Sequence, residues 1–346
     1  MALPPPQNGD RNSGHKHGAR FTDSAEHAPD LNVVPDDRSG EPSVCPACGS
    51  ALRFREAQAA RDYVTGDAFS VVRCSSCDVA WTHPRPEDMD RYYPPRYRRY
   101  VPVVTATLSL LYLWRVSNWS RACGKPGKAL EIGCGDGVML NALRARGWQV
   151  CGTERTAEMA AIARERYGIQ VYVPPDGPVA GRDAFDLVIL FQVLEHLPDP
   201  VATLHEARGF LTPHGRIVVG VPNLSSWQSR FGRDGWLHLD VPRHLVHFNP
   251  ASLAATANRA GLRVERIRFV SPEHDPYGWI QTLLNRWCSN RNRLTLLLMG
   301  MAPWRFQDLS TLCAVAFLGP LACLLAVVSW ACGAGAIMEA VLVRDE

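Results

Sequence analysis

The chain has 346 residues, of which 46% are hydrophobic and 21% charged, and its formal net charge is +3. This length is enough for one large catalytic domain with accessory parts that have their own cores. The small charge excess does not favour a nucleic-acid-binding protein. The densest basic run, residues 91–100, alternates arginine with tyrosine. We interpret it as a solvated loop and expect no nucleic-acid partner.

The N-terminal segment and the cysteines bear on the cellular compartment. Residues 1–42 are rich in Pro, Gly, Asn, Asp and His, and we predict a disordered tail there. The segment lacks the apolar stretch of a secretory signal. The eleven cysteines do not form the even framework of a small secreted domain. We therefore expect a reducing, cytoplasmic setting.

Two cysteine pairs, Cys45 with Cys48 and Cys74 with Cys77, are separated by 25 residues. Two such pairs supply the four thiolates of a closed tetrahedral zinc site, which has no open position for catalysis. Two disulfides are the alternative, which a cytoplasmic setting disfavours. The spacing predicts a structural zinc ribbon over residues 43–82. A linker and an N-terminal helix are expected over residues 83–127.

From residue 128 onward, short apolar runs alternate with helical patterns, which predicts a parallel α/β sheet. Residues 185–191 form a continuous apolar run, as expected for a strand that is buried on both faces. The predicted strands are 129–132, 149–153, 169–173, 185–191, 216–221 and 262–270. The predicted helices are 101–121, 138–146, 156–167, 201–211 and 252–260.

A glycine-rich loop follows the first of these strands. Gly133, Gly135 and Gly137 allow a tight turn and a close approach of a ligand to the backbone. The helix that follows offers free N–H groups and the positive end of its dipole. Glu131 stands two residues before this turn, where its carboxylate can meet a cationic amine. A dinucleotide-binding loop more often reads G-x-G-x-x-G, whereas the third glycine here comes one position earlier.

Glu154 lies at the end of the second predicted strand, 23 residues after Glu131. A carboxylate at that place can accept hydrogen bonds from both ribose hydroxyls of a nucleoside. The alternative is a surface carboxylate that opens a helix. The sequence therefore predicts a site for a ligand that carries both a nucleoside and an amine.

These motifs, together with the segments 186–197 and 211–216, resemble a class I S-adenosylmethionine (SAM)-dependent methyltransferase. The resemblance covers about residues 128–270 and the last dozen residues. It implies a Rossmann-like seven-stranded α/β sheet with helices on both faces. The last strand, expected within 334–346, is antiparallel and lies between strands five and six. The residues implied to contact SAM are Glu131, Gly133, Cys134, Gly135, Gly137, Glu154, Asp176 and Gln192.

Two histidine segments compete for the role of general base toward a hydroxyl acceptor. His196 follows strand four, at the sheet edge where ligands of open α/β folds bind. His244 belongs to a His-Leu-x-His-Phe element that is similar to one found over the acceptor pocket in this subgroup. His244 is the preferred base; the alternative is that His244 and His247 fill a polar core. Arg243 could hold an anionic group of the substrate.

An apolar segment interrupts the end of the pattern. Residues 309–338 carry no charge, and 312–332 is long enough to cross a membrane core at ~1.5 Å per residue. A full crossing would separate the last strand from its sheet and leave unpaired edges. Because proline breaks helices, we predict that Gly319-Pro320 divides this segment into a helical hairpin dipping into one leaflet. The membrane-associated insertion is expected over 271–333; one full span and a buried core helix are the alternatives.

The sequence thus predicts a SAM methyltransferase with a zinc-ribbon head, at the cytoplasmic face of the cell membrane. The zinc ribbon resembles that of bacterial methyltransferases, often from sugar pathways. O-methylation of a sugar, glycolipid or isoprenoid-type acceptor, small or lipid-linked, is the first prediction; C-methylation of a nucleotide sugar is the second. In quinone-pathway relatives an additional Glu binds a divalent metal where Gln192 stands here, which disfavours metal use. An NAD-type oxidoreductase and a non-catalytic SAM-binding scaffold are the rival hypotheses.

Overall fold

The structure is a computed structural model that describes residues 44–51, 54–94, 101–123, 125–174, 183–287 and 291–345. Two sequence-based predictions lie outside these residues: the N-terminal tail over 1–42 and the SAM contact by Asp176.

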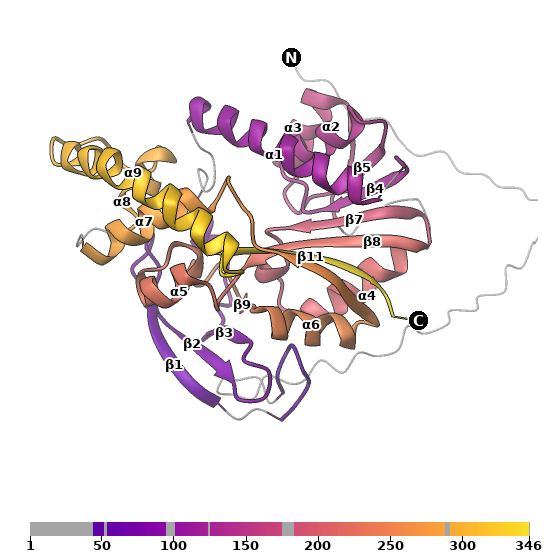
Figure 1. Cartoon of the computed structure of the whole chain (residues 1–346), viewed down its shortest axis with the longest axis horizontal. Coiled ribbons are helices and arrows are strands. Elements are labelled where there is room, and N and C mark those ends of the chain that lie inside the picture. The colour runs from indigo at the N-terminus through magenta and orange to yellow at the C-terminus, as the bar shows by residue number, and fades with distance from the viewer. Residues whose placement is uncertain are drawn as a thin grey trace, which may run out of the picture. The chain divides into compact units, whose positions relative to one another are not determined.

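A seven-stranded sheet forms the core, with the order β10-β11-β8-β7-β4-β5-β6. Figure 1 labels its strands β11, β8, β7, β4 and β5. The central strands β4 to β8 are parallel, whereas β11 pairs antiparallel with both β8 and β10. This confirms that the last strand lies between strands five and six. In chain order the strands are β4 (Lys128–Ile132), β5 (Gln149–Thr153), β6 (Gln170–Tyr172), β7 (Phe185–Phe191), β8 (Leu211–Pro222), β10 (Leu262–Arg268) and β11 (Ile337–Arg344).

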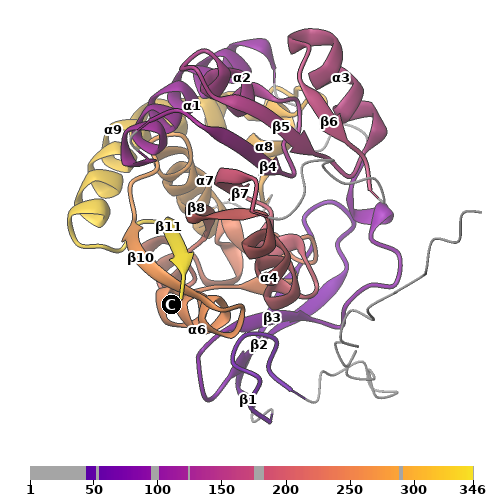
Figure 2. The same cartoon turned by 90° about the vertical axis from the view of Figure 1, so that its right-hand side faces the viewer.

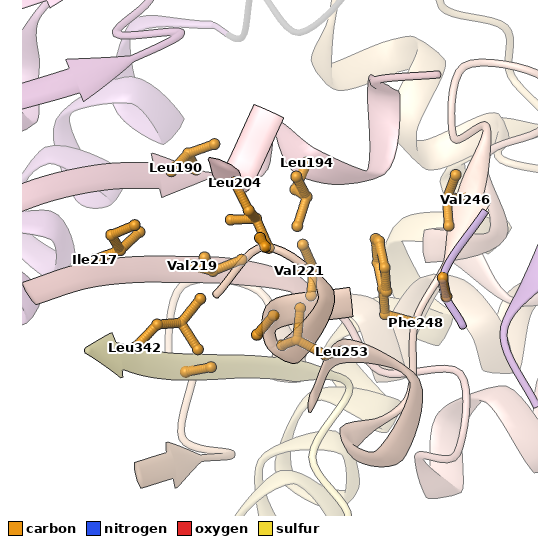
Figure 3. Close-up of a cluster of buried hydrophobic side chains, with 14 of the residues drawn as sticks. Leu190, Leu194, Leu204, Ile217, Val219, Val221, Val246, Phe248, Leu253 and Leu342 are labelled. Atoms are coloured by element: carbon orange, nitrogen blue, oxygen red, sulfur yellow. The ribbon is translucent and has the colours of Figure 1, made fainter. Parts of the chain in front are cut away.

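Helices cover both faces of this sheet (Figure 2). The strand β7 is buried on both sides, because Leu187 and Ile189 face one helical layer while Val188 and Leu190 face the other. Figure 3 shows Leu190 in the second of these layers, together with Ile217 of β8. The first layer contains α1 (Pro102–Cys123) and α2 (Val138–Arg144), with α3 (Ala157–Tyr167) packed beside α2; the second contains α4 (Pro200–Phe210) and α6 (Pro250–Arg259).

The strand β8 starts five residues before its predicted start at residue 216. Leu211 pairs with Phe185 of β7, and an irregular register then leads to the pair Leu187 with Arg216. The sequence Thr-Pro-His-Gly in between looks like a turn, and it is instead accommodated within the longer strand. The other predicted strands and helices are confirmed, with boundaries that shift by at most two residues.

The N-terminal part forms its own sheet with a contribution from the core. Strands β1 (Phe54–Arg61), β2 (Ala68–Cys74) and β3 (Ala80–His83) are antiparallel, and β9 (Val246–His247) pairs with β3. The residues predicted as a ribbon therefore share a sheet with the His-Leu-x-His-Phe element. Short elements connect the two sheets: η1 (Asp90–Tyr92), η2 (Leu194–His196), α5 (Trp227–Gly232), η3 (Arg233–Gly235) and η4 (Leu237–Leu239).

The insertion before β11 consists of α7 (Asp275–Trp287), α8 (Arg293–Leu298) and α9 (Asp308–Ala331). Because α9 runs through Pro320 without a break, the prediction that Gly319-Pro320 divides it is wrong. Gly319 has no Cβ to clash with the proline ring, which eases a helical conformation before proline. Ala322 and Ala326 also pack against α7, so the helix is held along its length. The hairpin forms between α7 and α9.

Most of the apolar surface of α9 is exposed. Among the described helices, it is the one whose length and composition would allow it to cross a membrane, and 17% of its most apolar stretch is buried. The exposed side chains include Phe317 and Leu324, at 83% and 59%. A buried core helix does not fit this exposure.

Candidate active site

The loop between β4 and α2 has the geometry that its glycines predict. Gly133, Gly135 and Gly137 have φ angles of 73°, 53° and 79°, in the left-handed region that glycine favours. A Cβ on Gly133 would lie 2.6 Å from Val193 Cγ2, so the close approach of two loops also requires glycine there. The loop thus presents its backbone at the start of α2.

Glu131 lies in β4 directly below this loop and is 2% exposed. Within the described part of the chain, its Oε2 atom has no hydrogen-bond partner. Burial raises the pKa of its carboxyl group well above the ordinary value, and the nearby carboxylates of Asp136 and Glu154 raise it further. A buried carboxylate without a partner is costly. An ammonium group would compensate it, which is the contact that the resemblance implies.

Glu154 is fixed at the end of β5, beside the glycine loop. Its Oε2 accepts a hydrogen bond from the Gly135 amide at 3.0 Å, and its Oε1 accepts from the Thr156 amide at 2.9 Å. Cys134 packs toward β5, since a Cβ on Gly152 would lie 2.7 Å from its Sγ, and burial raises the pKa of this thiol. Both residues lie at the loop as predicted, while their individual contacts with SAM stay predictions.

A cavity of about 790 Å³ opens beside this loop. Its size is within the range of ligand pockets. Gly135 and Gln192 line it, as predicted, and Gln192 brings a buried Oε1 atom that has no partner among the described residues. The remaining wall is mostly apolar, with Leu108, Leu111 and Tyr112 from α1, Phe191 from β7, and Leu298 and Met299 at the end of α8.

Several polar residues of this cavity were missed by the sequence analysis. His238 and Asp240 belong to the loop after α5, and Glu273 and His274 lie between β10 and α7, directly before α7. An available signal was that Glu273-His274 stands after strand six, so it reaches the carboxyl edge of the sheet where ligands bind. In the sequence-based prediction this segment belongs to the start of the apolar insertion over 271–333.

The wall formed by α1 is held by a buried arginine. Arg115 donates hydrogen bonds to Glu273 and to Glu339 of β11, and its guanidinium stacks on the Phe191 ring at 4.8 Å. Trp119 of α1 also donates to Glu339 at 2.8 Å. These contacts fix the helix that closes the cavity to the strand that completes the sheet.

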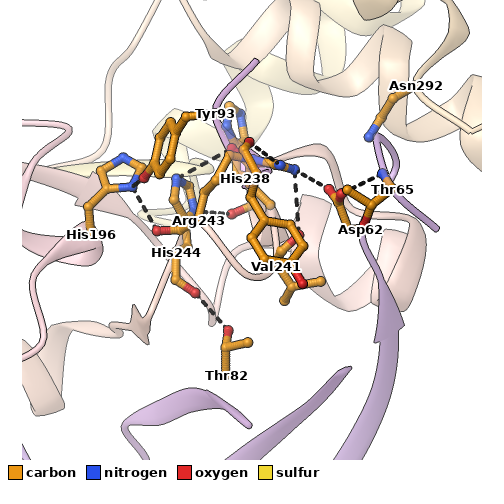
Figure 4. A network of polar contacts seen from close by, with 12 residues as sticks. Asp62, Thr65, Thr82, Tyr93, His196, His238, Val241, Arg243, His244 and Asn292 are labelled. Carbon is orange, nitrogen blue, oxygen red and sulfur yellow. Dashed lines mark hydrogen bonds and ion pairs between the residues drawn. The ribbon is translucent and has the colours of Figure 1, made fainter. Parts of the chain in front are cut away.

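The predicted histidines lie in a polar core beside the cavity (Figure 4). His244 is buried: its Nδ1 is 2.9 Å from the His238 carbonyl, and its Nε2 is 3.8 Å from Asp240 Oδ2. The Nδ1 of His196 is 2.8 Å from the Arg243 carbonyl. Neither ring lines the larger cavity, whereas His238 does. The roles of His244 and His196 as a base stay predictions.

The expectation that Arg243 could hold an anionic substrate group is wrong. Arg243 is fully buried and donates to Asp240 Oδ1 at 2.8 Å, Asp62 Oδ1 at 2.6 Å and the Tyr92 carbonyl at 2.9 Å. Its guanidinium therefore joins the N-terminal sheet to the loop that lines the cavity. His247 is also structural: burial lowers its pKa to about 3, so the ring stays neutral and contacts Thr82 Oγ1 at 3.0 Å.

The four paired cysteines converge on one point. All four Sγ atoms lie within 4.8 Å of one another, and Cys45–Cys77 and Cys48–Cys74 are separated by 3.6 and 3.9 Å. A tetrahedral zinc ion with Zn–S bonds of ~2.3 Å needs sulfur atoms about 3.8 Å apart. The thiols are not joined as disulfides. The donor set and its spacing fit zinc.

Comparisons with known proteins agree with this geometry. Residues 106–267 match a protein family described as a methyltransferase domain. The ubiquinone biosynthesis O-methyltransferase of Xanthomonas axonopodis pv. citri (strain 306) is 28% identical over 153 residues, which cover 40% of this chain and 64% of that protein. The protein of the same name from Xylella fastidiosa (strain M23) is 26% identical over 154 residues, covering 40% and 62%. The chain thus spans less than two thirds of these relatives.

Among solved structures, a SAM-dependent methyltransferase from Thermotoga maritima, described as a possible histamine N-methyltransferase, is 18% identical. The match covers 75% of this chain and 98% of that one, with a TM-score of 0.44. The matched residues include the strands β4 to β8, the glycine loop after β4 and the buried Glu131. Residues 106–267 of the chain are therefore similar to a methyltransferase domain.

Proposed function

We propose that this protein transfers the methyl group of SAM to a hydroxyl oxygen of an amphiphilic, glycolipid or isoprenoid-type acceptor. The observation that carries the proposal is the cavity of about 790 Å³, which joins the glycine loop to an apolar wall from α1 and α8. An apolar acceptor buries its own apolar surface against such a wall. The relatives named as O-methyltransferases support transfer to oxygen.

In this proposal Glu131 holds the amine of SAM, Glu154 the ribose hydroxyls, and Gln192 the side of the pocket that faces the acceptor. SAM supplies an activated methyl group, and the chain aligns acceptor, methyl and sulfur. A proton must also leave the acceptor hydroxyl. Asp240 lines the cavity, and its Oδ2 lies 3.8 Å from His244 Nε2. In the proposal the proton of the acceptor hydroxyl therefore reaches His244 through Asp240.

The test is incubation of the full-length protein with methyl-labelled SAM and cell-envelope extract, followed by mass spectrometry. We expect one labelled, lipid-extractable product whose label is on oxygen. The Glu131→Gln variant should form at least tenfold less of it at limiting SAM. A label on carbon of a water-soluble nucleotide sugar would support the C-methyltransferase alternative. SAM binding without any labelled product would support the non-catalytic scaffold.

Glu131 also gives the site a pH dependence. Its pKa is raised in the free protein, and an ammonium group favours the ionised carboxylate. SAM binding should therefore release a proton, and affinity should increase as the pH rises through the raised pKa. We expect Glu131→Gln to weaken SAM binding by roughly 10- to 100-fold, the value of a charge-assisted hydrogen bond, and to remove this dependence.

Calorimetry in buffers of different ionisation heat measures both the affinity for SAM and the number of protons that are released on binding. Because the folded-state pKa of Glu131 lies above its unfolded value, its contribution to stability decreases as the pH rises between the two values. The stability of Glu131→Gln should therefore not show this decrease with pH, although the variant binds SAM less well. Glu165→Gln, at an exposed position of α3, is the matched control. An unchanged affinity in Glu131→Gln would contradict the assignment.

We further propose that Cys45, Cys48, Cys74 and Cys77 bind one structural zinc ion. The sulfur spacing described above supports it, and the site stabilises two knuckles that contact the core. Arg259 of α6 donates to the Ala47 carbonyl at 3.3 Å, and Asn249 Nδ2 donates to Asp78 Oδ2 at 3.0 Å.

Purified protein should contain about one zinc per chain by elemental analysis. Cys74→Ser should lose the metal and lower the melting temperature, because removing one ligand opens the site. Cys313→Ser, at an exposed position of α9, should keep both. Retention of full zinc content in Cys74→Ser would argue against this ligand set.

The exposed face of α9 supports a third part of the proposal: the insertion 271–333 attaches the protein to the inner face of the cell membrane. Phe317 and Leu324 are large, apolar and exposed, while Trp304 and Arg305 stand just before the helix. Tryptophan and arginine at the end of an apolar helix suit a membrane–water interface.

Flotation with vesicles of phosphatidylglycerol and phosphatidylcholine tests this attachment. The double variant Phe317→Asp with Leu324→Asp should bind at least tenfold less, because charged side chains in the apolar layer are costly. Phe317→Leu with Leu324→Met keeps apolar side chains at both positions and should bind as the natural chain does. Equal flotation of both double variants would contradict attachment through α9.

A further inference from the structure

A second cavity, of about 630 Å³, lies next to the first. Its walls come from the β1–β2 turn, the η3–η4 region, Asn285 of α7 and residues within 291–305. Tyr63 and Asp240 line both cavities, so the two spaces adjoin at these residues. A molecule that occupies the larger cavity could therefore extend into the smaller one.

Four arginines from three segments line this second cavity: Arg61, Arg291, Arg293 and Arg305. Two of them have carboxylate partners. Arg291 pairs with Asp234 at 2.6 Å, and Arg293 donates to both oxygens of Asp308 at 2.8 and 2.7 Å.

Arg61 and Arg305 differ from this pair. The guanidinium of Arg61 donates to the Gly66 carbonyl at 3.2 Å. Over the residues that the structure describes, no ion pair to a carboxylate joins either Arg61 or Arg305. Asp62 and Asp240 also line the cavity, but in the described part of the chain they form no ion pair with its four arginines. Both pair instead with the buried Arg243. The wall therefore keeps a net positive charge.

Neutral donors complete the wall. Asn292 directly precedes α8 in a left-handed conformation, with φ of 52°, and is mostly buried. Its side-chain oxygen accepts from Asn285 Nδ2 at 2.7 Å, and Figure 4 shows the side chain extending toward the turn at Thr65. The oxygen is thus occupied, which leaves the amide nitrogen as the polar group at this wall.

We propose that this second cavity binds a phosphate or diphosphate group that forms part of the methyl acceptor. A phosphate monoester is negatively charged at neutral pH and would complement the net positive charge of this wall, to which Arg61 and Arg305 contribute. Guanidinium groups bind phosphate oxygens in a bidentate manner. The methylated hydroxyl lies in the larger cavity and the phosphate in the smaller one. The inference rests on the proposed function, whose acceptor it narrows to a phosphate ester.

Calorimetry with inorganic pyrophosphate and full-length protein tests the site. We expect saturable binding that weakens with salt. The double variant Arg61→Ala with Arg305→Ala should weaken it by roughly tenfold or more, as expected for loss of charge-assisted hydrogen bonds. Arg121→Ala, on the exposed surface of α1, is the matched control and should bind as before. Equal affinity in the double variant, or an equal loss in Arg121→Ala, would overturn the proposal.

SAM affinity, measured on the same samples, separates this inference from the proposed function. Loss of pyrophosphate binding with unchanged SAM binding supports a separate phosphate site. Pyrophosphate binding that depends on Glu131 and not on the arginines overturns the phosphate site, while methyl transfer stays open to its own test.

Two probes distinguish the sources of the phosphate. Uridine diphosphate represents a soluble ester, and vesicles of phosphatidic acid in phosphatidylcholine represent a lipid-linked one. A dependence on Arg61 and Arg305 with uridine diphosphate indicates a nucleotide-linked acceptor. The same dependence only with the vesicles indicates a lipid-linked acceptor. Binding of both probes without any dependence on these arginines overturns the site.

Discussion

The buried guanidinium of Arg243 is the contact on which the arrangement of the site depends. It joins Asp62 of the N-terminal sheet, the Tyr92 carbonyl of the connecting segment, and Asp240 of the cavity loop. Removing one partner of a buried ion pair typically costs about 3–5 kcal/mol, because the other charge stays buried without compensation. This buried charged group thus joins the N-terminal part to the loop that lines the cavity.

That coupling connects the cysteine cluster, which is distant from the glycine loop along the chain, to the loop that lines the cavity of about 790 Å³. The strand β9 continues the N-terminal sheet, and the buried residues of the His-Leu-x-His-Phe element hold its position. Thr82 of β3 donates to the His244 carbonyl at 2.6 Å, so the histidine loop is attached to that sheet by backbone and side chain. The interactions that fold the cysteine knuckles therefore also fix the position of the loop that carries His238 and Asp240.

Local patterns in the sequence were sufficient to predict the sheet and its cofactor loop. Apolar runs mark strands that are buried on both faces, and Gly133 to Gly137 turn as their spacing predicts. The polar wall of the cavity could not be predicted in this way. Arg115 meets Glu273 and Glu339 across separations of 158 and 224 residues, and no local periodicity encodes such contacts. The prediction that Arg243 could hold an anionic substrate group is wrong for the same reason, since the burial of Arg243 depends on Asp62 and Tyr92.

The error at Pro320 has a similar origin, and it has a consequence for the proposed contact of α9 with a membrane. Proline removes one backbone donor, but Gly319 before it and the packing of Ala322 and Ala326 on α7 keep α9 continuous. The end of α9 is also fixed: Trp330 donates to Asp275, and the Ala336 amide donates to the same carboxylate just before β11. Because β11 must lie between β8 and β10, the C-terminal end of α9 has to stay at the edge of the sheet. A helix held in this way cannot carry β11 across a bilayer without breaking both ladders of β11. In the proposed attachment, contact of the exposed side of α9 with a bilayer would bury its apolar surface and leave both ladders of β11 intact.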